Sequence, residues 1–216
     1  KERKNCNSQG IFTVKQLSCT FRPRRRPKRR RDKREKYHHS LKALAIREKK
    51  IHIVGSPAIK IEGTPVYLDV EGLPDLDFYY LIGIRIQNGE SVVQHSLWAD
   101  SLEDEKTIWN EFIEILSTLE DPVLIHYGSF ETAFLKRMCE RYGELIEGTA
   151  VQKSIKESLN LLTVTYAQIY FPGFSNGLKD TAGFLGFNWT DTDCTGLLSI
   201  AWRHFWEDQH DISIKE

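Results

Sequence analysis

Residues 66–97 read VYLDVEGLPDLDFYYLIGIRIQNGESVVQHSL and contain three apolar runs. The first run, 66–72, is rich in β-branched and apolar residues, and acidic residues lie near its end. The second and third runs, 79–86 and 91–97, are joined by Gln-Asn-Gly-Glu at 87–90. An Asn-Gly pair between two strand-like runs is a strong signal for a tight antiparallel hairpin. This stretch therefore predicts one strand followed by a hairpin of two more.

Helical periodicity marks the segment after the hairpin. Residues 101–119 repeat apolar side chains at helical spacing, and Ser101 can cap this helix with Asp104 three residues later. The further elements expected are a strand at 123–126, helices at 130–142, 178–185 and 196–207, and an ambiguous apolar segment at 158–171. A hairpin followed by a helix and another strand indicates an α/β fold, in which helices flank the faces of a mixed sheet.

Charge divides the chain near residue 60, although the 216 residues together have a formal net charge of zero. Residues 1–60 hold 20 Lys and Arg against 4 Asp and Glu, whereas residues 61–216 hold 10 against 26. We therefore expect a basic N-terminal extension over 1–60, with short helices near 12–17 and 34–50, and an acidic domain over 61–216.

The segment 22–36, RPRRRPKRRRDKREK, has eleven Lys or Arg in fifteen positions. Each phosphate contact made by such residues releases counterions, so the run favours tight binding to nucleic acid without sequence preference. The residues expected to make these contacts are Arg22, Arg24, Arg25, Arg26, Lys28, Arg29, Arg30 and Arg31. The alternative interpretation is a solvated linker or a nuclear-localisation-like patch.

Several common classes of protein lack their signatures in this sequence. It contains no glycine-rich dinucleotide motif or P-loop, no H-E-x-x-H zinc motif and no G-x-S-x-G nucleophile elbow. No apolar run reaches about 18 residues, so no membrane span is expected. The cysteines, Cys6, Cys19, Cys139 and Cys194, form no C-x-x-C pair. This spacing favours reduced thiols and a cytoplasmic location over a disulfide framework or a zinc knuckle.

Asp69 and Glu71 are the first candidates for chemistry. Strand side chains two positions apart face the same way, so both carboxylates emerge together if the strand continues through Glu71. Clustered carboxylates repel at neutral pH and favour a cation between them, and hard oxygen ligands suit Mg²⁺ or Mn²⁺. The alternative is that the pair forms the polar edge of the following loop, because D-x-E alone is common.

Glu131 is the second candidate, at the end of LIHYGSFE (124–131). A buried strand ends in this segment, a glycine turn follows, and Glu131 falls in the first turn of a helix. Functional sites lie at the carboxyl ends of parallel strands, so Glu131 can meet Asp69, with His126 or Tyr127 near a substrate. An acid at this position also complements the helix dipole without any functional role.

Two further segments carry weaker signals. Asp180, in GLKDTAGFLGF (177–187), falls in the first turn of a short helix, where an acid is favoured in any case. In WRHFWED (202–208), Arg203 and His204 are flanked by aromatic residues. Aromatic residues at helical spacing are expected to form core rather than a base-stacking surface.

Taken together, YLDVEG, the hairpin, LIHYGSFE and YFPGFSNGLKDTAGFLGFNW resemble the YprB-type ribonuclease H-like domain of the DEDD 3′→5′ exonuclease superfamily. The likeness is best over 62–207. Residues 12–25 and 37–53 also resemble the region that links such a domain to an N-terminal RecB-like nuclease in RecB-family nucleases. The resemblance implies a ribonuclease H-like mixed sheet flanked by helices, a nucleic-acid substrate, and a larger nuclease polypeptide to which this chain belongs.

The resemblance also implies roles for individual residues. Asp69 and Glu71 match the first exonuclease motif, and Glu131 matches the acidic position of the second, where the superfamily usually has Asp. These three residues are thereby the implied catalytic acids and ligands of Mg²⁺ or Mn²⁺. Asp180 matches a helix that precedes the third motif, so the resemblance does not imply that it binds a metal.

The Asp of the third motif has no convincing match before Glu216, since Asp208 and Asp211 are poor substitutes. We expect either a domain truncated before that acid or a domain that lacks it. The leading hypothesis is a metal-dependent nuclease that hydrolyses phosphodiester bonds by two-metal catalysis, with a 3′→5′ exonuclease-like action. The alternatives are a catalytically inactive nucleic-acid-binding module of a larger nuclease, and a purely structural interaction domain.

Overall fold

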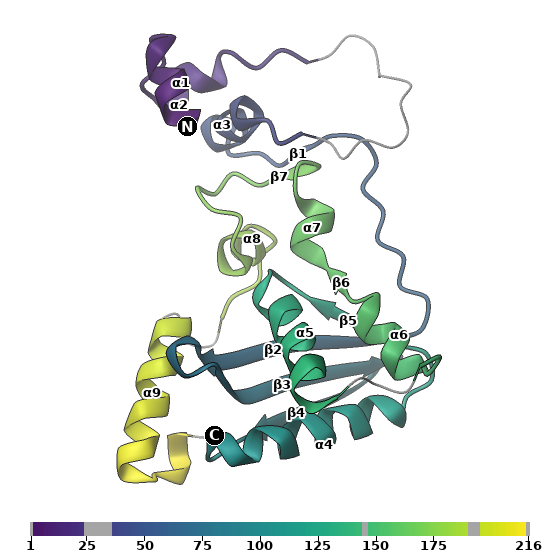
Figure 1. The fold of residues 1–216 in the computed structure, drawn as a ribbon. Coiled ribbons are helices and arrows are strands. Elements are labelled where there is room, and N and C mark those ends of the chain that lie inside the picture. The colour runs from purple at the N-terminus through teal and green to yellow at the C-terminus, as the bar shows by residue number, and fades with distance from the viewer. Residues whose placement is uncertain (1, 24–35, 144–146, 190–194, 215–216) are drawn as a thin grey trace. The chain divides into compact units, whose positions relative to one another are not determined.

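The computed structural model of the chain describes residues 2–23, 36–143, 147–189 and 195–214. The chain forms two compact units (Figure 1). The first unit comprises Lys1–Ile59 and Leu162–Asn188, and the second comprises Lys60–Leu161 and Trp189–Glu216.

A five-stranded mixed sheet forms the centre of the second unit, with the strand order β4-β3-β2-β5-β6 (Figure 1). Its strands are β2 (Thr64–Leu73), β3 (Phe78–Asn88), β4 (Ser91–Trp98), β5 (Pro122–His126) and β6 (Leu159–Asn160). The pairs β2–β3 and β3–β4 are antiparallel, whereas β2–β5 and β5–β6 are parallel. Asn88 pairs with Ser91, so the predicted hairpin closes over two residues. The predicted α/β mixed sheet is confirmed.

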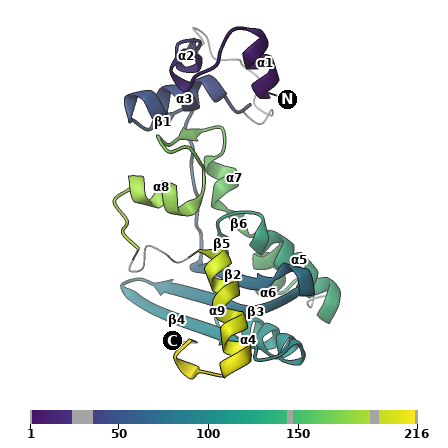
Figure 2. The same cartoon turned by 90° about the vertical axis from the view of Figure 1, so that its left-hand side faces the viewer.

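Helices cover both faces of this sheet. α4 (Glu105–Ser117) and α5 (Phe130–Tyr142) pack on one face, and α9 (Gly196–Gln209) crosses the other (Figures 1 and 2). Ser101 and Asp104 form the predicted capping box, at a 3-10 turn that leads into α4. α6 (Ala150–Lys156) was not predicted, because its seven residues carry only a short apolar repeat.

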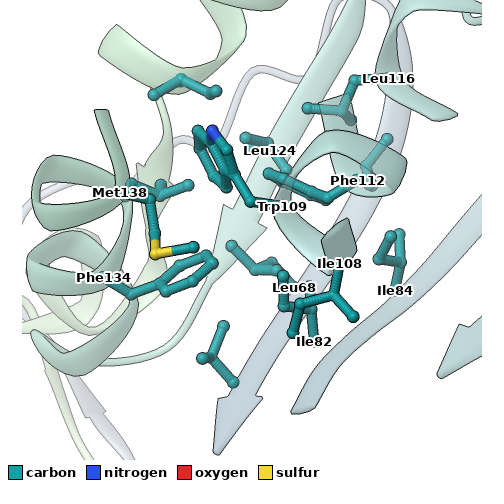
Figure 3. Packing of buried hydrophobic residues seen from close by; sticks show 14 of the residues in the cluster. Leu68, Ile82, Ile84, Ile108, Trp109, Phe112, Leu116, Leu124, Phe134 and Met138 are labelled. Carbon is teal, nitrogen blue, oxygen red and sulfur yellow. The ribbon is translucent and has the colours of Figure 1, made fainter. Parts of the chain in front are cut away.

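The hydrophobic core lies between the sheet and the helices α4 and α5. Trp109 of α4 and Phe134 and Met138 of α5 meet Leu68 of β2 and Ile82 of β3 (Figure 3). All five side chains are buried. Removing side chains of this size from water contributes about 1.5–3 kcal/mol each. This packing fixes which face of β2 turns away from the core.

The pairing of β2 with β3 is irregular beside the acidic motif. The register shifts between Glu71 and Gly72, so Tyr80 is an extra residue on β3. A Cβ atom on Gly72 would lie 2.8 Å from a backbone oxygen of β3, a distance that requires glycine here. The extra residue of a bulge shifts the alternation of side chains along its strand by one position. Tyr79 therefore contacts rings of α5, whereas the Tyr80 hydroxyl contacts α9.

The first unit is organised around α3 (His39–Glu48). Its other elements are α1 (Glu2–Ser8), α2 (Val14–Ser18), β1 (His52–Ile53), α7 (Leu161–Thr165, whose first residue lies in the second unit), β7 (Ile169–Tyr170) and α8 (Leu178–Phe184). β1 and β7 pair antiparallel, and Leu41 and Ala45 of α3 pack against Tyr170. The buried Lys42 ammonium group donates to three oxygens within 171–176.

Local signals predicted the elements of the first unit only in part. Thr13 caps α2 as predicted, and its capping box with Gln16 is complete. A helix was expected over 34–50. In the structure, residues 36–38 are not helical and the helix α3 spans His39–Glu48. The ambiguous segment 158–171 contains two short strands with α7 between them. Within the described ranges, every helix falls short of the length and hydrophobicity needed to cross a membrane.

Candidate functional site

β2 presents Asp69 and Glu71 on the face of the sheet opposite the core. Val66, Leu68 and Val70, which alternate with these acids, are buried in the core. The strand continues through Leu73, so both carboxylates leave the same face near its carboxyl end. The structure therefore has the alternation that the sequence predicted for this pair.

The two carboxyl groups lie where ionisation is unfavourable. Burial raises the pKa of Asp69, the Glu131 charge raises it further, and the backbone N–H of Val70 opposes both effects. Burial also raises the pKa of Glu71, and with the charge of Asp69 it brings that pKa to about 7. A hydrogen bond from Ser199 lowers the pKa of Glu71, whereas Glu131 raises it. Asp69 stays open to solvent on one side, so a ligand can reach it.

Glu131 enters the site from the turn between β5 and α5. Gly128 adopts φ +123°, a conformation that favours glycine, and Ser129 begins the helix that carries Glu131 in its first turn. The Asn160 side chain of β6 accepts a hydrogen bond from the Gly128 N–H and donates one to the Gly128 carbonyl oxygen. Asn160 therefore fixes the turn that positions Glu131, a role that no local sequence pattern indicated.

His126 is the last residue of β5 and lies beside Glu131. His126 is 3% exposed and Glu131 is 7% exposed, and 3.6 Å separates Nδ1 of His126 from Oε2 of Glu131. Within the described part of the chain, neither of these two atoms has a hydrogen-bond partner. Buried polar atoms normally make hydrogen bonds, so a carboxylate oxygen that has a 3.6 Å ion-pair contact with His126 and no hydrogen bond among the described residues fits a further ligand such as a cation.

The three acids share one region without forming a ready-made metal cluster. Glu131 contributes to the raised pKa of both Asp69 and Glu71, so its charge is felt at both strand carboxyls. Among the described residues, however, no three or more His, Cys, Asp or Glu side chains are grouped closely enough to hold a metal ion. The donor set suits a hard divalent cation in its chemistry, because carboxylate oxygens are the preferred ligands of Mg²⁺ and Mn²⁺.

The remaining predicted residues belong to other segments of the chain. Asp180 belongs to the first unit, where Ser175 donates a hydrogen bond to it. Asp208 is exposed on α9. Arg22 is exposed, and the remaining predicted nucleic-acid contacts, Arg24, Arg25, Arg26, Lys28, Arg29, Arg30 and Arg31, lie outside the described residues. Arg203 is buried, together with Trp206, whereas Trp202 is 42% exposed.

Comparison with known proteins identifies a family for most of the chain. A family model described as the RNase H superfamily matches residues 66–216, which is more than half of the sequence. Neither the comparison with curated proteins nor the comparison with solved structures gave a match. The matched range includes most of β2, the β5–α5 turn and α9, and it excludes the basic segment 22–36.

Proposed function

The chain belongs to the RNase H superfamily, and on this premise we propose that it is a metal-dependent nuclease that hydrolyses phosphodiester bonds of nucleic acids. The observation that carries the proposal is that Asp69 and Glu71 lie near the carboxyl end of β2, that Glu131 lies in the first turn of α5 after the parallel strand β5, and that the Glu131 charge raises the pKa of both strand acids. Asp69 and Glu71, whose ionisation is disfavoured by burial and by neighbouring carboxylates, are stabilised by a divalent cation.

Asp69, Glu71 and Glu131 are the residues that would hold Mg²⁺ or Mn²⁺. When bound, the ion supplies positive charge that activates a water molecule and stabilises the oxygen leaving phosphorus. The chain itself supplies the oxygen donors and fixes two of them on a strand. Asn160 holds the turn that places the third. The Oε2 atom of Glu131, which makes no hydrogen bond among the described residues, supports its assignment as a ligand.

The finer assignment is a 3′→5′ exonuclease domain of the YprB type within a RecB-family nuclease. Its support is the combination of motifs around Asp69, Glu131 and 170–189, with Glu131 at a position where the wider superfamily usually has Asp. We also keep the proposed division into a basic extension, 1–60, and a nuclease domain, 61–216. The extension would bind nucleic acid through the tract 22–36, whose charge is the reason for this proposal.

A second candidate function is a nucleic-acid-binding module without catalytic activity. One observation favours it: the described residues contain no close group of three metal-binding side chains. Such a module would bind nucleic acid in a salt-dependent way that is indifferent to divalent ions and to substitution of Asp69.

Cleavage of end-labelled DNA and RNA, single- and double-stranded, in Mg²⁺ or Mn²⁺ separates the two functions. We expect the chain to shorten at least one of these substrates, and Asp69→Asn to lower the rate at least about a hundredfold, because removing a metal ligand costs more than removing a residue that only orients one. The matched control is Asp75→Asn, an exposed acid in the loop after β2 that should retain activity. Equal cleavage by Asp69→Asn and the parent chain would exclude the proposed site.

A further inference from the structure

Three tyrosines of the first unit form a row of contacting rings. Tyr170 of β7 is buried, Tyr37 before α3 is half-buried, and Tyr166, directly after α7, is 46% exposed. The ring centroids of Tyr37 and Tyr170 lie 5.2 Å apart. Those of Tyr37 and Tyr166 lie 4.9 Å apart, and their ring planes differ by only 21°. This tyrosine row therefore leads from the interior of the unit to its surface, where the Tyr166 ring is partly open to solvent.

Contacts around the buried end of the row hold the turn that carries Tyr166. The Tyr170 hydroxyl accepts a hydrogen bond from the His38 N–H at 2.9 Å and donates one to the Ala167 carbonyl oxygen at 3.3 Å. Ala167, the residue after Tyr166, is buried and has φ +65°, a left-handed conformation that residues other than glycine rarely adopt. Such a conformation persists only where the surrounding structure imposes it. The exposed Tyr166 ring is therefore carried on a fixed turn.

Positive charge accompanies the tyrosine row. The described residues of the first unit hold 10 Lys or Arg against 3 Asp or Glu. Lys36, which directly precedes Tyr37, is exposed and is the last residue of the basic segment 22–36. The exposed His39 ring lies edge-on to Tyr37, with 5.0 Å between the ring centroids. An open aromatic ring in a basic unit suits a ligand that combines flat rings with negative charge.

We propose that the first unit binds single-stranded nucleic acid by stacking a base on the open face of Tyr166, in continuation of the tyrosine row, while Lys36 contacts a phosphate. Proteins that bind single strands combine basic residues along the backbone with aromatic rings on which bases stack. The inference deepens the proposed function and rests on its substrate class, since it names the single-stranded form as the one bound. An apolar protein segment would gain nothing from the positive charge of this unit, so the charge favours nucleic acid as the occupant.

Binding of two oligomers of equal length tests the stacking without relying on cleavage. One is a fluorescently labelled thymidine oligomer, and the other has the same label and the same phosphates but abasic sugars. Fluorescence anisotropy in EDTA, which prevents metal-dependent cleavage, measures the affinity of the full chain for each. We expect the thymidine oligomer to bind about 5–150-fold more tightly, which is the range that corresponds to one stacked base.

Substitutions separate the base contact from the phosphate contact. Tyr166→Ala should remove most of the preference for the thymidine oligomer, whereas Tyr166→Phe, which keeps the ring, should retain it. Lys36→Gln should instead weaken binding of both oligomers equally and lower the slope of log affinity against log salt by about 0.7, because one phosphate contact is lost. The control Phe205→Ala removes a ring of the second unit that is 54% exposed, and it should change neither affinity.

The results distinguish this inference from the proposed function. Equal affinity of the parent chain for the two oligomers overturns the inference whatever the variants do. A folded Tyr166→Ala variant that keeps the parental preference also overturns it, and would leave the Tyr166 ring to a protein partner. Cleavage by the same chain in Mg²⁺ or Mn²⁺ would keep the proposed function standing in both cases. A preference that depends on Tyr166 in a chain that cleaves nothing would support the inference and contradict the nuclease activity.

Discussion

Glu71 is held in the fold where ionisation of its carboxyl is unfavourable, whereas the proposed site requires that carboxyl to be ionised. Its carboxyl is partly buried, faces the charge of Asp69, and has a pKa raised to about 7. A folded chain without a cation is therefore less stable when this group ionises. Residues whose ionisation is disfavoured by both burial and a like charge concentrate at functional sites, which supports Glu71 as a ligand.

The stability of the metal-free protein should depend on pH through Glu71. Because the pKa rises from 4.5 to about 7 on folding, the stabilisation is complete below pH 4.5 and is lost as pH rises through about 7. We expect a loss on the order of 1–2 kcal/mol, less than the full shift, because solvent reaches the carboxyl. Urea unfolding at pH 5 and pH 8 with a chelator measures it.

The variant Glu71→Gln identifies the source of this pH dependence. A neutral amide cannot ionise, so the difference in unfolding free energy between pH 5 and pH 8 should shrink relative to the parent chain. Asp75→Asn, which changes an exposed carboxyl, should leave that difference unaltered. An unchanged difference in Glu71→Gln would assign the effect to other groups.

At the scale of elements, local signals predicted the scaffold of the site well. The Asn-Gly hairpin, the capping box of α4 and the helix over 130–142 depend on neighbouring residues, so the sequence alone revealed them. Other contacts near the site join residues that are far apart in the chain. Asn160 holds Gly128 from 32 residues away, and Ser199 meets Tyr80 across 119 residues. No local sequence pattern predicts contacts between residues so far apart in the chain.

For helix α9, the local sequence predicted the helix but not which of its side chains are buried. Its periodicity predicted a helix over 196–207, and the structure extends it to Gln209. The aromatic spacing predicted core positions for Trp202, Phe205 and Trp206, yet of these three only Trp206 is buried. The buried face is set by Arg203, whose charge would ordinarily place it in solvent. Its burial depends on carbonyl groups at Ala99 and Asp100, which the sequence of the helix cannot reveal.

Replacing Arg203 with lysine should destabilise the second unit. An ammonium group cannot reproduce the planar fork that reaches two carbonyl oxygens while it contacts aromatic rings. We expect a loss of about 2–4 kcal/mol, since a buried charge would be left incompletely paired. Chemical denaturation followed by tryptophan fluorescence measures the loss. The control Arg85→Lys changes an exposed arginine of β3, and equal stability of the two variants would contradict the anchoring role.

At the scale of the whole molecule, one chain combines a long acidic stretch of sequence with a basic segment. Residues 61–216 carry an excess of Asp and Glu, whereas 22–36 holds eleven Lys or Arg. An acidic surface repels a polyanion, so the proposed nuclease needs a separate source of affinity for nucleic acid. The basic tract is that source in our proposal, because of its charge.

Salt dependence of binding should report the phosphate contacts of this tract. We expect the double variant Arg29→Gln, Arg30→Gln to bind single-stranded nucleic acid more weakly. The slope of log affinity against log salt should fall by about 0.7 for each phosphate that the variant no longer neutralises. Fluorescence anisotropy at several salt concentrations measures the slope. The double variant Lys106→Gln, Lys136→Gln removes the same charge from the second unit, and an equal change in both variants would argue against a specific role for the tract.

The most direct test of the proposed site is a double-mutant cycle on Mn²⁺ affinity with Asp69→Asn and Glu131→Gln. If both carboxylates hold the same ion, each substitution weakens binding, and the double variant departs from the sum of the single effects by about 0.5–3 kcal/mol. Strictly additive effects, or a Glu131→Gln variant that binds Mn²⁺ as tightly as the parent chain, would contradict a shared metal site.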